Sequence, residues 1–569
     1  MSFLHVHSCE CAKTELELFT LPPTQTTIES SQWVHYKPIS SLTDNLPIEF
    51  VVQGQGDEYI DLAHTMLRLC VGITRRILVT ASAHPPKVAP INNFMHSIFS
   101  QVDVLFNQKP VSTPNNLYPY RAYIETLLNY GADAKKSHLT TVGWCCDTPG
   151  KMDSLTDENL GLKKRKELLT CDKTADFIGH LHCDVFNQER FLINGVEMRL
   201  RLTCARDAFC LMDDTVNGCV YNISDASLLV RRAKISPGTL LAHARMLAKT
   251  TAKYPLTRVE VKAVSMAAGV HGETMDNILH GQIPRRLIIG FVDNKAFNGD
   301  ASMNPFNFQN FGINYLSLYV DGRQIPSKPL QPDFGNRMNY IDAYHTLFSG
   351  TGIHFLNEGN SIDRFDYPNG YCLYAFDLTP DLSANSNTHW NLIKHGTVRI
   401  EVRFDKVLAT TTNCIVYAEY ESVLEIDASR QVTIDFVGKI YTRERVQKSY
   451  LESLLCRPVI NIEDLQNSPS VSTLHQPRLT CAFHSVLESR RNRSHGYNQC
   501  ALSCADLLKQ WLSKKANSEA GENSYEPSLV CPWGCEACNE HGAGLKSYSV
   551  YTIPRDWSVS CRQDPESLD

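Results

Sequence analysis

Two histidines, His180 and His182, have a spacing that could bind a metal ion. They stand in Gly179-His180-Leu181-His182, a segment whose apolar neighbours indicate a β-strand. Side chains alternate along a strand, so residues two apart share a face and could chelate one cation, with Glu189 downstream. The alternative is a pair of hydrogen-bonded strand histidines. The sequence favours this alternative, because an imidazole readily finds a donor or an acceptor there.

A second candidate metal site consists of Cys531, Cys535, Cys538 and His541. Three thiolates and one imidazole in a single loop could supply tetrahedral zinc ligation. Protein zinc sites, however, usually divide into two ligand pairs separated by roughly a dozen or more residues. Incidental cysteines are therefore the favoured interpretation, and neither a metal nor another cofactor is expected.

The strongest run of charge is Lys163, Lys164, Arg165 and Lys166. Such a basic run could be a nuclear-import signal or a surface that faces phosphate groups. A solvated loop between strands is the simpler interpretation, and the sequence favours it.

Composition limits the remaining possibilities. The chain has 569 residues, 43% of them hydrophobic and 20% charged, with a formal net charge of −6. These values are typical of a soluble globular protein of several domains and argue against a dedicated nucleic-acid binder. The P-loop, dinucleotide, H-E-x-x-H and G-x-S-x-G patterns are missing, so we expect no enzyme. The apolar runs are too short to cross a membrane, and no secretion leader is recognised, which predicts an intracellular protein with reduced cysteines.

Short β-branched and aromatic runs fill residues 47–436, with Gly, Pro, Asn and Asp between them. In Val398–Phe404 every second residue is apolar, which predicts a half-buried strand. Two helices interrupt this pattern. Apolar residues at helical spacing predict one over 120–130, preceded by Pro119, and another over 340–350.

The two helices belong to an internal repeat. In the first copy, strand Val102–Phe106 and a turn precede Ala122–Leu128; in the second, strand Leu316–Val320 and a turn precede Ala343–Phe348. The offset of about 220 residues predicts two tandem β-domains of similar fold.

Several segments, spread over about residues 30–436, resemble the major capsid protein of Polinton (Maverick) virus-like transposons. The segments that carry this resemblance are Gly56–Leu62, Tyr118–Tyr123, Ala296–Gly299, Asn304–Phe306, Val320–Gly322, Phe376–Thr379, Gly396–Phe404, Tyr417–Tyr420 and Leu424–Asp427. The resemblance implies an all-β fold of two tandem jelly-roll sandwiches, a double jelly-roll, with short inserted helices. We expect an N-terminal arm over 1–45, a first jelly-roll over 46–258, a second over 259–436, and a poorly ordered cysteine-containing extension over 437–569.

The resemblance also implies a structural protein. Its members form homotrimeric, pseudo-hexagonal capsomers that contact one another laterally in an icosahedral shell, with a minor (penton) capsid protein as a partner. It implies neither a membrane partner nor sequence-specific nucleic-acid binding, and it places the protein in the virion, with the nucleus as a further expectation. Two alternatives stay open: a domesticated host jelly-roll binding protein, and a metal-dependent bicupin-type enzyme using His180 and His182. The second departs from the cupin pattern, because the gap to Glu189 is too long.

Overall fold

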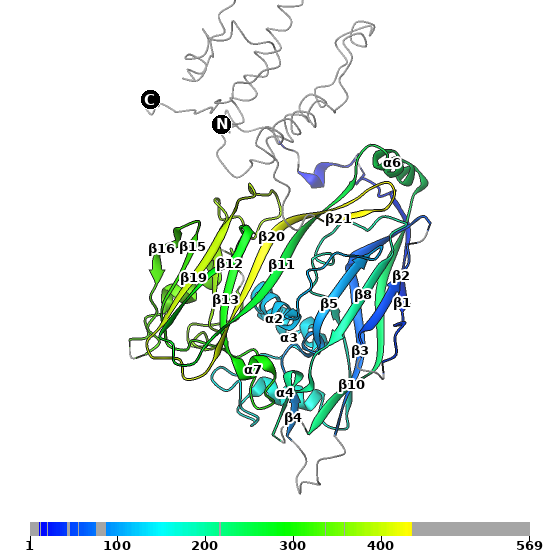
Figure 1. Ribbon diagram of the computed structural model, residues 1–569. Coiled ribbons are helices and arrows are strands. Elements are labelled where there is room, and N and C mark those ends of the chain that lie inside the picture. Colours follow the sequence, from blue (N-terminus) through cyan, green and yellow to red (C-terminus); the bar gives the residue numbers. More distant parts are fainter. Residues whose placement is uncertain are drawn as a thin grey trace, which may run out of the picture. The chain divides into compact units, whose positions relative to one another are not determined.

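Antiparallel β-sheets make up most of the computed structural model of the chain (Figure 1). The structure describes residues 11–434, apart from residues 12, 20, 43–45, 55, 76–86, 215–217, 336, 355 and 358. The extension predicted over 437–569 and its candidate zinc ligands, Cys531, Cys535, Cys538 and His541, lie outside the described residues.

The first sandwich consists of two four-stranded sheets whose apolar side chains face each other. Strand β2, for example, alternates between buried and half-buried residues, which is the pattern of a strand with one face in a core. One sheet has the order β1 (Ile28–Tyr36), β10 (Cys219–Ile235), β3 (Glu58–Arg75), β7 (Thr174–His180), and the other β2 (Ile48–Val52), β8 (Met198–Cys204), β5 (Phe99–Phe106), β6 (Lys109–Pro110).

The second sandwich is built in the same way. Its strand β19 alternates as the sequence predicts, with Val398, Ile400, Val402 and Phe404 buried. One sheet has the order β11 (Ala252–Met266), β20 (Thr412–Ile426), β13 (Arg286–Asp293), β18 (Leu373–Asp377), with β21 (Val432–Ile434) beside β20. The other has the order β12 (Gly272–Gln282), β19 (His395–Phe404), β15 (Ile313–Val320), β16 (Arg323–Leu330).

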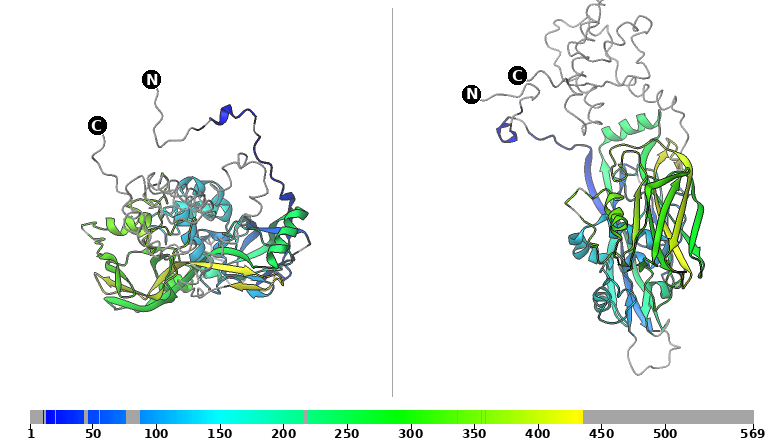
Figure 2. Two further views of the ribbon diagram at one scale, coloured as in Figure 1. Left: turned by 90° about the horizontal axis from the view of Figure 1, so that it is seen from above. Right: turned by 90° about the vertical axis from the view of Figure 1, so that its left-hand side faces the viewer.

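The two strand orders correspond one to one. The first, third, seventh and last of the eight strands of each sandwich occupy the same places, so β1 corresponds to β11, β3 to β13, β8 to β19 and β10 to β20. The strands of both sandwiches run in roughly the same direction, upright in Figure 1 and in the right-hand view of Figure 2. The predicted double jelly-roll is therefore confirmed, and the internal repeat is the repeat of the sandwich.

Short helices connect the strands, and none in the described part is long and apolar enough to span a bilayer. Both predicted helices are present, as α2 and α8. The α-helices are α1 (Phe94–Ser97), α2 (Tyr118–Asn129), α3 (Ala132–Lys136), α4 (Leu160–Leu168), α5 (Asp207–Cys210), α6 (Pro237–Leu247), α7 (Asn294–Asn298) and α8 (Ile341–Ser349). The remaining elements are two 3-10 turns, Thr14–Leu16 and His138–Val142, and the strand pairs β4 (Val88–Pro90) with β9 (Leu211–Asp213) and β14 (Phe308–Gln309) with β17 (Asn369–Gly370).

The structure differs from the predicted domain boundaries at two places. Strand β1 lies within the predicted arm, yet it pairs with β10 through backbone hydrogen bonds. Its side chains are mostly exposed, so it lacks the apolar alternation by which a strand is recognised. Strand β11 begins at Ala252, before the predicted boundary at residue 258. It includes Pro255, which is tolerated because β11 is an edge strand that pairs on one side only.

Candidate functional site: the contact between the two sandwiches

Helix α2 lies between the two sandwiches (Figure 1). It contacts β5 of the first sandwich and β11 of the second. Pro119 lies in its first turn, where a missing backbone N–H costs least. Ten of its twelve residues are buried, because one side packs on its own sandwich and the other on the neighbouring one. The buried apolar side chains of both sandwiches consequently form one continuous cluster.

Aromatic rings on one side of α2 contact the second sandwich. The ring of Tyr123 stacks on Phe306 of the second sandwich, with centroids 4.2 Å apart and planes 7° apart. Tyr120 stacks on Phe297 at 5.7 Å and meets Phe306 edge-on at the same distance. Aromatic pairs at such distances add attraction beyond the burial of their area, so these rings fix the helix against the second sandwich.

A buried ionic group lies on another side of α2. Glu125 accepts hydrogen bonds from Arg121 at 2.8 Å and from the Tyr417 hydroxyl of β20 at 3.2 Å, and it contacts His182 at 2.6 Å. Tyr417 also donates to Glu419 at 3.1 Å. Burial opposes the charge on Glu125, but Arg121 and His182 outweigh it and lower the pKa of Glu125 to about 2. The carboxylate is thus ionised and links both sandwiches.

A second buried polar group centres on Asp147. Its carboxylate pairs with Arg165 at 2.6 Å and accepts from Asn304 of the second sandwich at 3.1 Å. Its backbone carbonyl accepts from the Tyr371 hydroxyl at 2.7 Å. The side chains of Arg165 and Asp147 are each 1% exposed. Since both are fully paired, this group also joins the first sandwich to the second.

The basic run is not the solvated loop that the sequence favours. Its residues lie on helix α4, where Lys163 and Lys164 are exposed and Arg165 is buried. A helix turns by about 100° per residue, so the four side chains cannot share one surface. Arg165 binds inside the protein, and no continuous exposed surface of Lys163, Lys164, Arg165 and Lys166 exists.

The two candidate metal-binding histidines have separate partners. His180 ends β7 and contacts the backbone carbonyl of Phe186 at 3.1 Å, whereas His182 lies beyond the strand and contacts Glu125. Within the described residues, no group of three metal-ligating side chains occurs. The arrangement is that of two hydrogen-bonded histidines with different partners.

Sequence reasoning missed the residues of this contact other than His182 and Arg165. Glu125 was visible as one charged residue within an apolar helix, four residues after Arg121, a spacing at which side chains meet on a helix. Its partner Tyr417 gave no local signal, because it belongs to another element, and the same holds for Asp147, the partner of Arg165.

A third histidine makes this contact sensitive to acid, and we expect stability to fall below about pH 6.5. His96 is buried between His182, at 4.7 Å between ring centroids, and the hydroxyl of Tyr118. Burial, and then the charges of His182 and His180, lower the pKa of His96 well below its usual value of 6.5. As the pH falls below about 6.5, the histidine of the unfolded chain therefore binds a proton before His96 of the folded chain does. Stability is lost over this pH range, by at most about 1.4 kcal/mol per pH unit.

Urea unfolding between about pH 7.5 and about pH 5 tests this expectation. His96→Gln should flatten the pH dependence, because glutamine does not titrate. The carboxyl of Glu125 does not contribute here, since its stabilisation is lost only below the usual value of 4.5. An unchanged pH dependence in the variant contradicts the assignment to His96.

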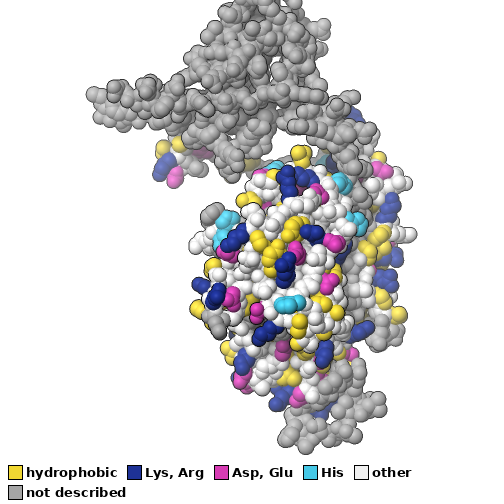
Figure 3. Space-filling model, turned by 60° about the vertical axis from the view of Figure 1, so that its left-hand side comes forward, with side chains coloured by type: hydrophobic (Ala, Val, Ile, Leu, Met, Phe, Trp, Pro, Cys, Tyr) yellow, Lys and Arg dark blue, Asp and Glu magenta, His cyan; other side chains and the backbone are white. Residues whose placement is uncertain are grey.

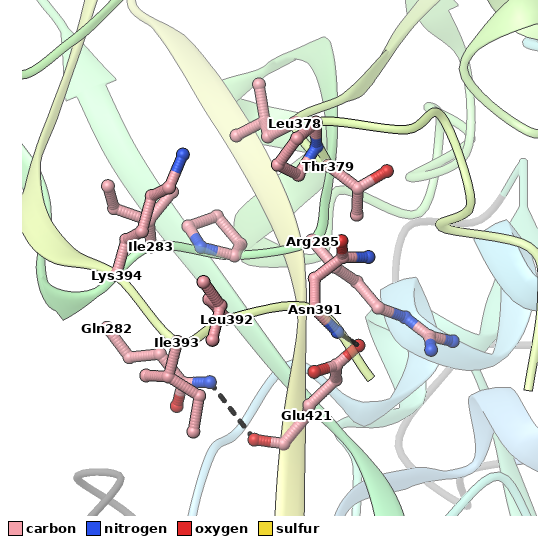
Figure 4. A pocket seen from close by; sticks show the side chains of 12 residues that line it. Gln282, Ile283, Arg285, Leu378, Thr379, Asn391, Leu392, Ile393, Lys394 and Glu421 are labelled. Atoms are coloured by element: carbon pink, nitrogen blue, oxygen red, sulfur yellow. Dashed lines mark hydrogen bonds between the residues drawn. The ribbon is translucent and has the colours of Figure 1, made fainter. Parts of the chain in front are cut away.

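A small hollow lies on the second sandwich beside β20 (Figure 4). Gln282 donates to the backbone carbonyl of Glu421 at 3.0 Å, and the backbone N–H of Asn391 donates to its carboxylate at 3.3 Å. Burial raises the pKa of Glu421. The volume is about 40 Å³, room for a few waters and far less than the roughly 300 Å³ of a small-molecule site.

The outer sheet of the second sandwich carries paired arginine and tyrosine side chains. Arg399 lies over the ring of Tyr319 at 4.2 Å, and Arg403 lies over Tyr315 at 4.8 Å. On the face of the molecule in Figure 3, hydrophobic, basic and acidic side chains intermingle. Arginine and tyrosine are enriched where proteins contact one another, so this sheet has the composition of an interaction surface.

Comparisons with known proteins find one relative by sequence and several proteins of similar fold. No family model matches the chain. It is 27% identical over 433 residues to an uncharacterized protein of Caenorhabditis elegans, an alignment that covers 73% of this chain and 100% of the relative. It is also similar to a chain in the cryo-EM structure of the Sputnik virophage, with a TM-score of 0.54 and 11% identity over 82% of this chain and 99% of that one. The mavirus major capsid protein aligns with a TM-score of 0.46 and 12% identity, covering 81% and 99%.

Strand order and the virophage comparison agree on the fold. The chain is a double jelly-roll protein. At 11% identity the likeness extends to the fold alone.

Proposed function

We propose that this chain is a major capsid protein of the Polinton (Maverick) kind, which forms homotrimeric, pseudo-hexagonal capsomers. The observation that carries the proposal is the repeat of one sandwich with one strand order, the two copies being joined through the buried helix α2. Three chains built in this way present six similar sandwiches, so a closed trimer can occupy a nearly hexagonal tile. The segments that resemble Polinton capsid proteins and the fold of the virophage chain support the same function.

The remaining parts of the proposal follow from such tiles. Capsomers would contact one another laterally through outer surfaces, of which the arginine–tyrosine sheet is one candidate. Six-sided tiles alone cannot close a shell, so a separate minor (penton) capsid protein would fill the five-sided positions. The protein would then reside in the virion, and assembly in the nucleus would suit an element that is copied from chromosomes.

The mass of the purified full chain in solution tests the proposal. Light scattering should give three times the 64.1 kDa of one chain, stable on dilution and constant over a range of concentrations. Electron microscopy of concentrated samples should then show hexagonal tiles or shells. A monomer at every concentration contradicts the capsomer, and a mass that rises without limit indicates open association instead of a closed trimer.

A further inference from the structure

Helix α6 lies at one end of the first sandwich, where it connects β10 to β11 (Figure 1). It packs on the protein with one side only, and none of its residues is buried. On the packed side, Leu240 and Leu247 contact the core, and Nδ1 of His243 lies 2.9 Å from the Tyr59 hydroxyl. The other side of the helix therefore faces away from the sandwich.

The outward side of α6 combines apolar and basic side chains. Leu241 is 53% exposed and Met246 is 56% exposed, and Arg245 and Lys249 are exposed as well. Residues four apart on a helix lie in one row, so Arg245 follows Leu241, and Lys249 extends the row in the turn after the helix. Neither basic side chain has an ion-pair partner among the described residues. We call Leu241, Arg245, Met246 and Lys249 the α6 face.

A short segment before β1 has apolar side chains and the opposite charge. This segment, Glu15–Phe19, consists of two glutamates and three large apolar residues. Leu16, Leu18 and Phe19 are 71%, 75% and 97% exposed, and apolar side chains exposed together indicate a contact surface. Both glutamates are exposed, and neither has an ion-pair partner among the described residues. We call Glu15–Phe19 the arm segment.

The chain itself keeps the arm segment within reach of the α6 face. The backbone N–H of Ser236, the residue before α6, donates to the carbonyl of Thr27 at 2.9 Å. Phe19 is eight residues from this anchor, and eight residues span at most about 28 Å. Helix α6 is about 16 Å long, so the arm segment can reach all of the α6 face. A tether of this length gives the segment an effective concentration on the order of millimolar there.

We propose that the arm segment docks on the α6 face of its own chain and forms a strap across the helix. The apolar side chains of the segment cover those of the α6 face, and its two glutamates meet Arg245 and Lys249. Burial of apolar surface supplies most of the attraction, whereas the exposed ion pairs select the segment. The tether favours the same chain over a second copy. The strap is independent of the capsomer proposed above, so the failure of one leaves the other standing.

Digestion of the full chain with chymotrypsin measures the docking, because the protease cleaves after Phe19 only while the arm segment is free. Mass spectrometry of the released N-terminal fragment gives the rate. Leu241→Asp should raise this rate at least about tenfold, since it places a charge among the covered apolar side chains. Leu160→Asp is the matched control and should leave the rate unchanged, because Leu160 is 61% exposed on α4, at the other end of the first sandwich (Figure 1). Equal rates for the wild-type and Leu241→Asp chains overturn the proposal.

Exchange of charges identifies the two partners. Arg245→Glu should raise the cleavage rate about fivefold. Adding Glu17→Arg to the same chain should restore protection, because the ion pair forms again with its charges reversed, whereas fraying of α6 would not be repaired in this way. A doubly substituted chain that is cleaved as fast as Arg245→Glu overturns the proposal.

Two singly substituted chains, produced together in one cell, distinguish the source of the strap. If each arm segment docks on its own chain, both the Glu17→Arg chain and the Arg245→Glu chain are cleaved as fast as when produced alone. Protection of the Glu17→Arg chain in this mixture shows docking on a second copy and overturns the proposal. Circular dichroism and thermal unfolding equal to those of the wild-type chain confirm that the variants fold.

Discussion

Replacing Arg165 with alanine is expected to destabilise the protein by about 3–5 kcal/mol. The guanidinium group is buried and pairs with the equally buried Asp147, and it also donates to the backbone carbonyl of Pro90 at 2.9 Å. Its removal leaves a carboxylate without its counter-charge in a medium that solvates charge poorly. Urea denaturation of the purified variant, compared with the wild-type chain, measures the loss.

Lys164→Ala is the control for this substitution. Lys164 adjoins Arg165 on the same helix but is exposed, so its loss should change the free energy of unfolding by less than about 0.5 kcal/mol. If both variants lose equal stability, the basic run acts as one surface, and the buried pair with Asp147 does not explain the role of Arg165.

Replacing Tyr120 with alanine should also cost about 3–5 kcal/mol, because it opens a cavity in the aromatic contact. The ring of Tyr120 meets Phe297, Phe306 and Phe308 of the second sandwich within 6.3 Å between centroids. Tyr120→Phe should instead raise the free energy of unfolding. The hydroxyl of Tyr120 is buried and has no hydrogen-bond partner among the described residues, so its removal should stabilise the chain by about 1 kcal/mol.

The pair of Tyr120 variants separates packing from polarity. Thermal or urea unfolding of both variants shows whether the ring or the hydroxyl dominates. If Tyr120→Phe lowers the stability, the hydroxyl has a partner. If Tyr120→Ala lowers the stability only slightly, α2 does not hold the sandwiches together. Because α2 sets how the two sandwiches meet, Tyr120→Ala should reduce trimer formation as well as stability.

Local pattern explains why so much of the fold was predictable. The alternation of Val398–Phe404 is the burial pattern of β19, and apolar residues at helical spacing locate α2 and α8. These signals exist because each element must bury one face, so its apolar residues recur with the period of its backbone. The internal repeat likewise predicts two sandwiches, since similar sequence orders build similar units.

Strand β1 shows where local pattern fails. It is held by backbone hydrogen bonds to β10, which any sequence can make, and its side chains lie in solvent. Backbone pairing does not require particular residue types, so the sequence predicts residues 28–36 as part of an arm.

The sequence by itself determined the class of fold, the two helices and the repeat. Only the tertiary structure decided which charged residues are buried: Arg165 pairs with Asp147, and Glu125 meets His182 and Tyr417. The physical reason is distance along the chain. Periodicity reports the surroundings of a residue within its own element, whereas the partner of a buried charge lies up to hundreds of residues away and is brought near only when both sandwiches have packed.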